Sequence, residues 1–367
     1  MLEYLRFPVE ASRGRRYPEP EHPYRSAFQR DRDRIIHCRA FRRLEHKTQV
    51  FAPALSDHFR NRLTHTIEVA QIARTVSNVL GLNEDFTEAL ALVHDVGHPP
   101  FAHAGEDALN RMMERYGEAF DHNIQSLRAV DSLEHRYPRF PGLNLTFEVR
   151  EGIVKHSRDY RPGESEIVDR YQPELKPPIE AQLIDLADEI AYNSADLDDA
   201  YEAGLLSLRQ IAVGVPVFAE ILETVETQFP GATEREQFQE SVRQLIDGLV
   251  SGLIEGTAAA ARAANLFTVD GVRRHPARIA QFSPAAGATS TVLKRFLFAN
   301  VYSSHALDQD RSDSVSRLTR MFEHFMRVPE DVPGVRNNRR SLHRAVCDYI
   351  AGMTDRYFFQ VYSDIFA

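Results

Sequence analysis

The sequence predicts an all-α fold: a helical bundle with additional helices toward the C-terminus. Two observations support it: apolar residues recur at helical spacing along most of the chain, and strand-like alternation is scarce. With 43% apolar and 26% charged residues among 367, the composition is that of a globular protein with a large core. The one expected exception is a small β-hairpin within 266–286, formed by Phe267–Val272 and Ile279–Phe282.

Each expected helix has its own signal. An N-terminal arm, residues 1–25, precedes helical periodicity from Ser26 to about Gln49. Thr64 to Leu80 carries a continuous apolar stripe, and the next helix begins after Asn83, a natural N-cap. Further helices are expected over 104–116, 122–136, 147–156 and 179–206. We expect one mostly helical domain over 1–367, with a core at about 58–206 and a C-terminal helical region over 207–367.

Charge and cysteine content limit the classes of function. The net charge of −9 disfavours a protein whose main ligand is nucleic acid, so nucleic-acid binding is expected to be weak or regulatory at most. Arginines are dense from Arg13 to Arg43, either as a solvated helix face or, for a few, as part of an anion site. Cys38 and Cys347 are expected to be free buried thiols. Without a membrane-length apolar run or a signal-like start, we expect a cytoplasmic protein.

Four residues form a candidate metal site: His65, His94, Asp95 and Asp188. His65 opens one apolar helix and His94-Asp95 closes the next, where buried polar groups would need a partner. Asp188 lies in a largely apolar stretch. Each residue alone is more often a satisfied core or surface group. Together they are a mixed nitrogen and oxygen set suited to one divalent ion: Mn, Fe, Co, Ni, Zn or, less well, Mg.

The order of these residues resembles the HD-domain superfamily. The string His94-Asp95-Val96-Gly97-His98-Pro99-Pro100-Phe101-Ala102-His103-Ala104-Gly105-Glu106 is similar to the signature of the dGTPase-type dNTP triphosphohydrolases. The resemblance continues in 61–70, in the Asp188 helix and in 348–355, so it covers nearly the whole chain. It implies metal-dependent hydrolysis of deoxynucleoside triphosphates, with dGTP favoured, to deoxynucleoside and inorganic triphosphate. A homo-oligomer and an activating second nucleotide are further expectations.

Three residues are candidates for proton transfer. His103 and Glu106 are three positions apart at a helix start, so they share a face, and a carboxylate beside an imidazole raises the imidazole pKa and orients the ring. The resemblance implies that both serve catalysis. It also implies that His122 is an active-site histidine. The alternative for His122 is an ordinary residue beside a helix cap.

The substrate-binding candidates are Gln49, Arg62, His98, Tyr192 and Asp196. Arg62 lies one turn before His65 and could clamp a phosphate. Tyr192 and Asp196 continue the face of Asp188, and the resemblance implies contacts to phosphate and to the sugar 3′-hydroxyl; the alternative is a polar surface stripe. By resemblance Gln49 touches sugar or base, unless it is an exposed loop amide. His98 holds a phosphate or supports a ligand, unless it packs on the prolines that follow it.

Three other functions stay open. Another HD-type nucleotide phosphohydrolase or phosphodiesterase is one, although Val96-Gly97-His98-Pro99 differs from the residues those classes usually place after His-Asp. A nucleotide-sensing regulator without turnover is the second, and the presence of all four candidate ligands and His103 argues against it. A nucleic-acid-binding protein or nuclease is the third, and the acidic net charge argues against that.

Overall fold

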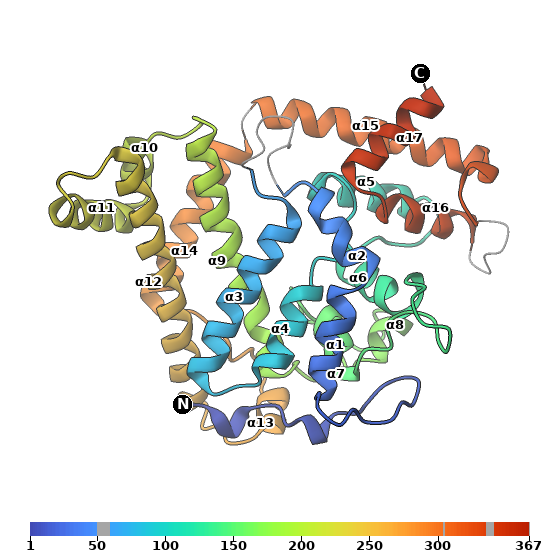
Figure 1. The fold of residues 1–367 in the computed structure, drawn as a ribbon, viewed down its shortest axis with the longest axis horizontal. Coiled ribbons are helices and arrows are strands. Elements are labelled where there is room, and N and C mark those ends of the chain that lie inside the picture. Colours follow the sequence, from blue (N-terminus) through green and yellow to red (C-terminus); the bar gives the residue numbers. More distant parts are fainter. Residues whose placement is uncertain (50–58, 304, 335–340, 367) are drawn as a thin grey trace. The chain divides into compact units, whose positions relative to one another are not determined.

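The computed structural model describes residues 1–49, 59–303, 305–334 and 341–366, and the regular elements in these ranges are helices (Figure 1). Two isolated bridges, between Arg15 and Thr146 and between Thr48 and Asn61, are the β pairings in this part of the chain. The predicted all-α fold is therefore confirmed. The chain forms two compact units, each assembled from separate segments.

The first unit comprises Met1–Ser12, Ile67–Ala91 and Lys155–Ser304. Two short 3-10 turns come first, η1 (Glu3–Leu5) and η2 (Val9–Ala11). The α-helices are α3 (Arg62–Leu80, from Ile67 on), α4 (Glu84–Val93, to Ala91), α8 (Glu166–Asp169), α9 (Ile179–Glu202), α10 (Leu208–Gly214), α11 (Pro216–Gln228), α12 (Glu234–Ala263), α13 (Val269–Arg274) and α14 (Pro284–Leu297). A π-helical turn, η5 (Phe298–Tyr302), follows α14. The long α12 begins at a capping box formed by Thr233 and Glu236 and packs on α9, α11 and α14. Because α9 buries residues on most of its circumference, it forms the centre of this unit.

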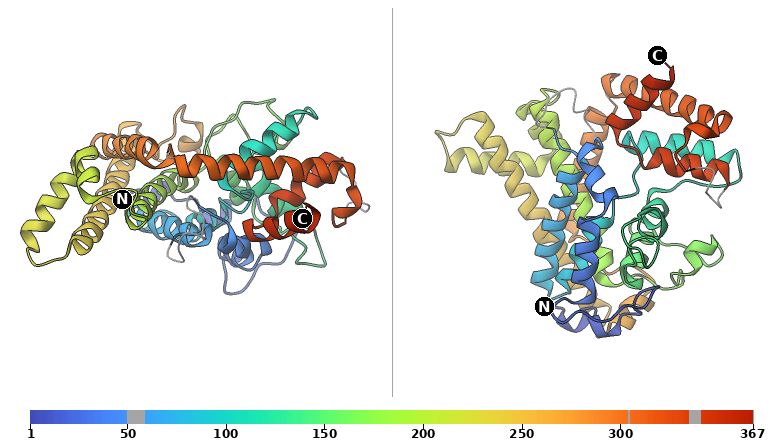
Figure 2. Two further views of the ribbon diagram at one scale, coloured as in Figure 1. Left: turned by 90° about the horizontal axis from the view of Figure 1, so that it is seen from above. Right: turned by 45° about the vertical axis from the view of Figure 1, so that its right-hand side comes forward.

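The second unit comprises Arg13–Thr66, Leu92–Val154 and His305–Ala367. Its helices are α1 (Ala27–Ile36), α2 (Arg39–Arg43), η3 (Leu44–His46), α5 (Ala102–Glu114), α6 (His122–Arg128), the π-helical η4 (Ala129–Leu133), α7 (Phe147–Val154), α15 (His305–Arg327), η6 (Pro329–Asp331), α16 (Leu342–Ala351) and α17 (Asp355–Phe366). Figure 2 shows the long α15 from two directions, and it packs on α5 and α16. Buried apolar residues of α5, α15, α16 and α17 form one core, which includes Leu109, Phe322, Phe325, Ile350 and Phe358.

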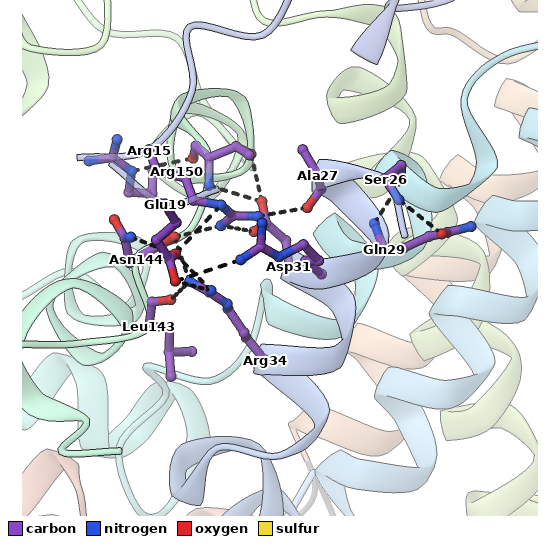
Figure 3. A network of polar contacts seen from close by, with 12 residues as sticks. Arg15, Glu19, Ser26, Ala27, Gln29, Asp31, Arg34, Leu143, Asn144 and Arg150 are labelled. Atoms are coloured by element: carbon purple, nitrogen blue, oxygen red, sulfur yellow. Dashed lines mark hydrogen bonds and ion pairs between the residues drawn. The ribbon is translucent and has the colours of Figure 1, made fainter. Parts of the chain in front are cut away.

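The arginines of the N-terminal arm are structural. Arg15 pairs with Asp31, and Arg34 donates two bonds to Glu19, at 2.9 and 2.7 Å, and further bonds to the carbonyls of Leu143 and Asn144 (Figure 3). Arg34 is 8% exposed and Asp31 is fully buried. The expectation of a solvated helix face is therefore wrong for these two arginines, because their guanidinium groups are used to attach the arm to α1 and to the segment before α7.

The predicted hairpin within 266–286 is wrong. Thr268 caps α13, its side chain accepting a bond from the amide of Gly271 at 3.0 Å, so Val269 to Arg274 is helical. Farther along, the amides of Ile279 and Ala280 both donate to Oε1 of Gln182. The backbone groups that a strand would pair are thus taken up by side chains.

Both cysteines are free and buried, as predicted. Burial raises the pKa of Cys38 and of Cys347 to about 12, so both thiols are protonated and unreactive. None of the helices in the described ranges is long and apolar enough to cross a membrane.

Candidate active site

The turn between α4 and α5 carries most of the candidate residues. Gly97, in this turn, and Gly105, in α5 (Ala102–Glu114), allow close packing of the backbone. A Cβ on Gly97 would stand 2.1 Å from the amide nitrogen of Ser126, and one on Gly105 would stand 1.9 Å from the carbonyl oxygen of Pro100 in the turn. The turn ends with Phe101 and Ala102 in the left-handed region, at φ of 66° and 52°, which is costly for residues with a side chain. The surrounding packing therefore imposes this shape on the turn.

Three of the four predicted metal donors belong to the second unit. The His65 and His94 rings have centroids 5.9 Å apart and are 1% and 2% exposed, and Nε2 of His94 is 3.5 Å from Oδ1 of Asp95. Burial opposes ionisation of Asp95, but the charges of His94 and Arg62 outweigh it and hold its pKa well below the usual value. Two buried imidazoles and one anionic carboxylate fit a divalent transition metal ion.

Asp95 also contacts two of the predicted substrate-binding residues. Nη1 of Arg62 donates to Oδ2 at 2.6 Å, and Nε2 of His98 lies 3.2 Å from Oδ1. Arg62 is 2% exposed and His98 is 3% exposed, so both contacts are shielded from water. Burial and the charge of Arg62 lower the pKa of His98 well below its usual value, which favours the neutral ring. In this arrangement Arg62 and His98 orient Asp95.

Glu106 lies between the two candidate proton-transfer histidines. Its Oε1 is 2.8 Å from Nδ1 of His122 and accepts the His122 amide at 2.9 Å, while its Oε2 is 3.5 Å from Nδ1 of His103. Burial would lower the pKa of His122, but the bond to Glu106 and its charge raise it. The His103 side chain is 80% exposed and that of His122 is 17% exposed. Glu106 therefore links the exposed imidazole of His103 to the more enclosed imidazole of His122. Its charge favours the protonated form of His122.

These residues form a compact group that we call the histidine cluster: His98, His103, Glu106 and His122. The His98 and His122 rings stack with centroids 4.1 Å apart, and His103 lies edge-on to His98 at 5.5 Å. Donor atoms of His98, Glu106 and His122 lie within 4.8 Å of one another, so this group could also hold a cation. The pairing of Glu106 with His122 was not predicted.

The remaining predicted donor, Asp188, lies on α9 in the first unit, and its membership of the metal set stays a prediction. Within that unit its Oδ2 is 4.0 Å from Nε2 of His156. Farther along α9, Asp196 is 2% exposed and accepts a hydrogen bond from the hydroxyl of Tyr302, in the π-helical turn after α14. Asp196 is therefore not part of a surface stripe. Tyr302 carried no local signal in the sequence.

Two further substrate-binding candidates have environments of their own. Tyr192 is half-buried on α9, where burial, Glu189 and Asp188 all raise the pKa of its phenol, so it stays protonated and able to donate. Gln49 is half-buried in the second unit, and its Oε1 has no hydrogen-bond partner in the described part of the chain. A buried amide oxygen in this state can accept a bond from a ligand.

Comparison with known proteins gives consistent results. Residues 62–193 match the HD domain family, and residues 280–364 match the phosphohydrolase-associated domain. Relatives from Geobacter sulfurreducens and Ralstonia nicotianae are both 47% identical over 97% of this chain and 92% of their own lengths. One from Brucella ovis is 45% identical over 94% of this chain and 90% of its own. All three are named deoxyguanosinetriphosphate triphosphohydrolase-like protein.

Proposed function

Since this chain belongs to the deoxyguanosinetriphosphate triphosphohydrolase-like family of HD-domain phosphohydrolases, we propose that it hydrolyses deoxynucleoside triphosphates to deoxynucleoside and inorganic triphosphate, with dGTP favoured. One observation carries the proposal: Glu106, held between His103 and His122, lies in the same unit as the buried donors His65, His94 and Asp95. That unit supplies proton-transfer groups and metal donors together.

The metal part of the proposal concerns four side chains. His65, His94, Asp95 and, from α9, Asp188 would hold one divalent ion, which supplies Lewis-acid polarisation of a phosphoryl oxygen when bound. The low pKa of Asp95 suits this role, because the carboxylate need not lose a proton before it binds a cation. Arg62 and His98 keep that carboxylate oriented.

The proton-transfer part concerns the histidine cluster. A water attacks the α-phosphorus and gives up a proton, the bond from that phosphorus to the sugar O5′ breaks, and O5′ takes up a proton. The exposed ring of His103 can reach a substrate, and Glu106 stabilises an imidazolium beside it. His122, whose pKa is raised, is bonded to the same carboxylate and can hold the second proton that the reaction moves.

The substrate-binding part uses five residues: Gln49, Arg62, His98, Tyr192 and Asp196. The free Oε1 of Gln49 can accept a bond from sugar or base, and the neutral phenol of Tyr192 can donate to phosphate. Asp196 can receive the 3′-hydroxyl, with the Tyr302 hydroxyl holding its carboxylate. Arg62 has one nitrogen on Asp95 and an Nε without a bond in the described residues, which suits a phosphate contact.

The test is a product analysis. Purified protein is incubated with each dNTP, each NTP, cyclic nucleotides and single-stranded DNA, with Mn²⁺ or Mg²⁺, singly and in mixtures. We expect triphosphate and deoxynucleoside from dNTPs, fastest from dGTP. Pyrophosphate with a monophosphate would mean that a different bond is broken. Binding without turnover would indicate a sensor, and DNA degradation a nuclease.

Two proposals concern assembly and control. Because its sequence resembles this family, we also propose that the chain forms a homo-oligomer and is activated by a second nucleotide. The mixtures test activation, since one dNTP should then accelerate hydrolysis of another. Light scattering of the purified protein tests the oligomer.

A further inference from the structure

The lysine that contacts the turn of the candidate site, Lys47, has an unusual environment. Lys47 is 3% exposed, and its ammonium donates to two backbone carbonyls, that of His98 and, at 3.1 Å, that of Ala351. Lysine is almost never fully buried unless its charge is compensated. The first of these carbonyls belongs to the turn of the candidate site, and the second is the last residue of α16. Lys47 therefore connects that turn to the C-terminal helices.

An aspartate makes a second connection between the same two segments. Asp355, 8% exposed, is the first residue of α17, and its Oδ1 accepts a bond from the amide of Phe101 at 3.2 Å. Its Oδ2 accepts a bond from the amide of Thr48 at 2.8 Å, the residue after Lys47. One carboxylate thus holds the end of the turn and the segment that carries the lysine.

The backbone held in this way is strained. Phe101 and Ala102 both have positive φ, and a residue with a side chain keeps this conformation only where its surroundings impose it. The Phe101 ring packs edge-on against Phe358 at 4.8 Å and also contacts Phe359 at 5.3 Å, both on α17. The amide and the ring of Phe101 are therefore both fixed by the C-terminal helix.

We propose that Lys47 and Asp355 are positioning residues for the hydrolysis: they hold the turn from His98 to Phe101 and so fix where the His98 and His103 imidazoles stand. The kinetic part rests on the proposed function; the geometric part rests on the contacts alone. His98 contacts Asp95 and stacks on His122, so a shift of its backbone would disturb both. His103 lies two residues after Phe101 in the first turn of α5.

The kinetic test uses Lys47→Met, which keeps the length of the side chain and removes the donors, and Asp355→Ala. Since a misplacement of about 1 Å can cost ~10²-fold in rate, we expect kcat to fall about 10- to 100-fold. KM should rise as well, because His98 is one of the proposed substrate-binding residues, and the loss of metal should be smaller than in His94→Ala. Arg43→Met is the matched control: Arg43 donates to the carbonyl of Gly352 at 2.8 Å, next to Ala351, and makes no hydrogen bond to the turn among the described residues. It should keep wild-type kcat.

A second measurement does not depend on turnover. The histidine side-chain ¹⁵N spectrum should change at His98 and His122 in Lys47→Met and Asp355→Ala, and should match wild type in Arg43→Met. If wild type hydrolyses no dNTP, the proposed function fails and these spectra still decide the positioning role. Asp355→Asn, which keeps one acceptor, replaces Asp355→Ala if that variant does not fold. Folded variants with wild-type kcat and wild-type histidine spectra, even if less stable, would overturn the proposal.

Discussion

The arm network around Arg15 and Arg34 and the histidine cluster around Glu106 are both charged regions of the second unit, but their charges are used differently. In the arm network each guanidinium meets a carboxylate, and its other donors end on backbone carbonyls. In the histidine cluster one carboxylate faces two imidazoles, and Nδ1 of His98 has no hydrogen-bond partner in the described ranges.

The two regions also differ in their pKa shifts. Burial opposes ionisation of Glu19, yet the bond and charge of Arg34 lower its pKa, so the pair stays ionised with no proton to exchange. In the histidine cluster the pKa of His122 is raised while that of His98 is lowered, although their rings stack. Neighbouring groups pushed in opposite directions are typical of acid–base sites.

The largest expected effect concerns the metal donors. His94→Ala or Asp95→Ala should abolish activity and remove bound metal together, because each deletes a donor from the buried set of His65, His94 and Asp95. Metal analysis and a dNTP assay on the same preparation check this. A His94→Ala protein that keeps its metal would show that His94 is not a metal donor.

The next largest effect concerns proton transfer. General acid–base catalysis contributes about 10²–10⁴-fold, so His103→Ala should lower kcat by that order while metal and substrate still bind. Glu106→Gln keeps the shape and removes the charge, so it should lower kcat and shift its pH profile. If His103→Ala keeps near-normal kcat and His122→Ala does not, the acid–base role belongs to His122, the closer partner of Glu106.

The arm network should give a loss of stability without a loss of rate. Arg34→Met leaves Glu19 with a hydrogen bond from the Asn144 amide, at 2.9 Å, and with the more distant Arg15 and Arg30, at 3.9 and 3.6 Å. Breaking a buried pair typically costs about 3 kcal/mol or more. Urea denaturation should show a loss of that size, with kcat and metal content unchanged. A fall in kcat below the unfolding transition would contradict the structural assignment.

Glu180 is a third kind of carboxylate: it is buried and accepts hydrogen bonds from two backbone amides, those of Phe7 and Asn83. Burial raises its pKa to about 7, and the amide bonds oppose this only in part. The protonated form therefore contributes stability that is complete below the unfolded pKa of about 4.5 and is lost as pH rises through about 7.

The variant Glu180→Gln removes this titration. Relative to it, wild type should lose about 2 kcal/mol of unfolding free energy between pH 5 and pH 7. Denaturant unfolding at a series of pH values measures the difference. Parallel stability curves for the two proteins would show that Glu180 does not titrate between pH 5 and pH 7.

Local patterns predicted the helices well, because a single apolar face is visible within one segment. The start of α3 near His65, the end of α4 before His94 and the extent of α9 all follow from such faces. The hairpin failed because Phe267–Val272 resembles a strand in composition, whereas the cap from Thr268 decides for a helix.

Contacts between distant segments were out of reach. The bond between Glu106 and His122 spans 16 positions, and Tyr302 lies 106 positions from Asp196. Asp355 lies in a string that resembles the family, yet its contact with Thr48, 307 positions away, could not be predicted from the periodicity of the sequence. The sequence could propose residue types for chemistry, but the partners that tune them depend on the tertiary fold.

The interleaving of the two units has a consequence for biosynthesis. The second unit includes residues 305–367, which complete the core shared by α5, α15, α16 and α17, whereas the segments of the first unit end at Ser304. On the ribosome, α5 must therefore wait for the last helices, with Leu109 and Met113 lacking their apolar partners from α15. Nascent chains arrested before α15 should bind hydrophobic-site chaperones through this surface and release them once α17 has emerged.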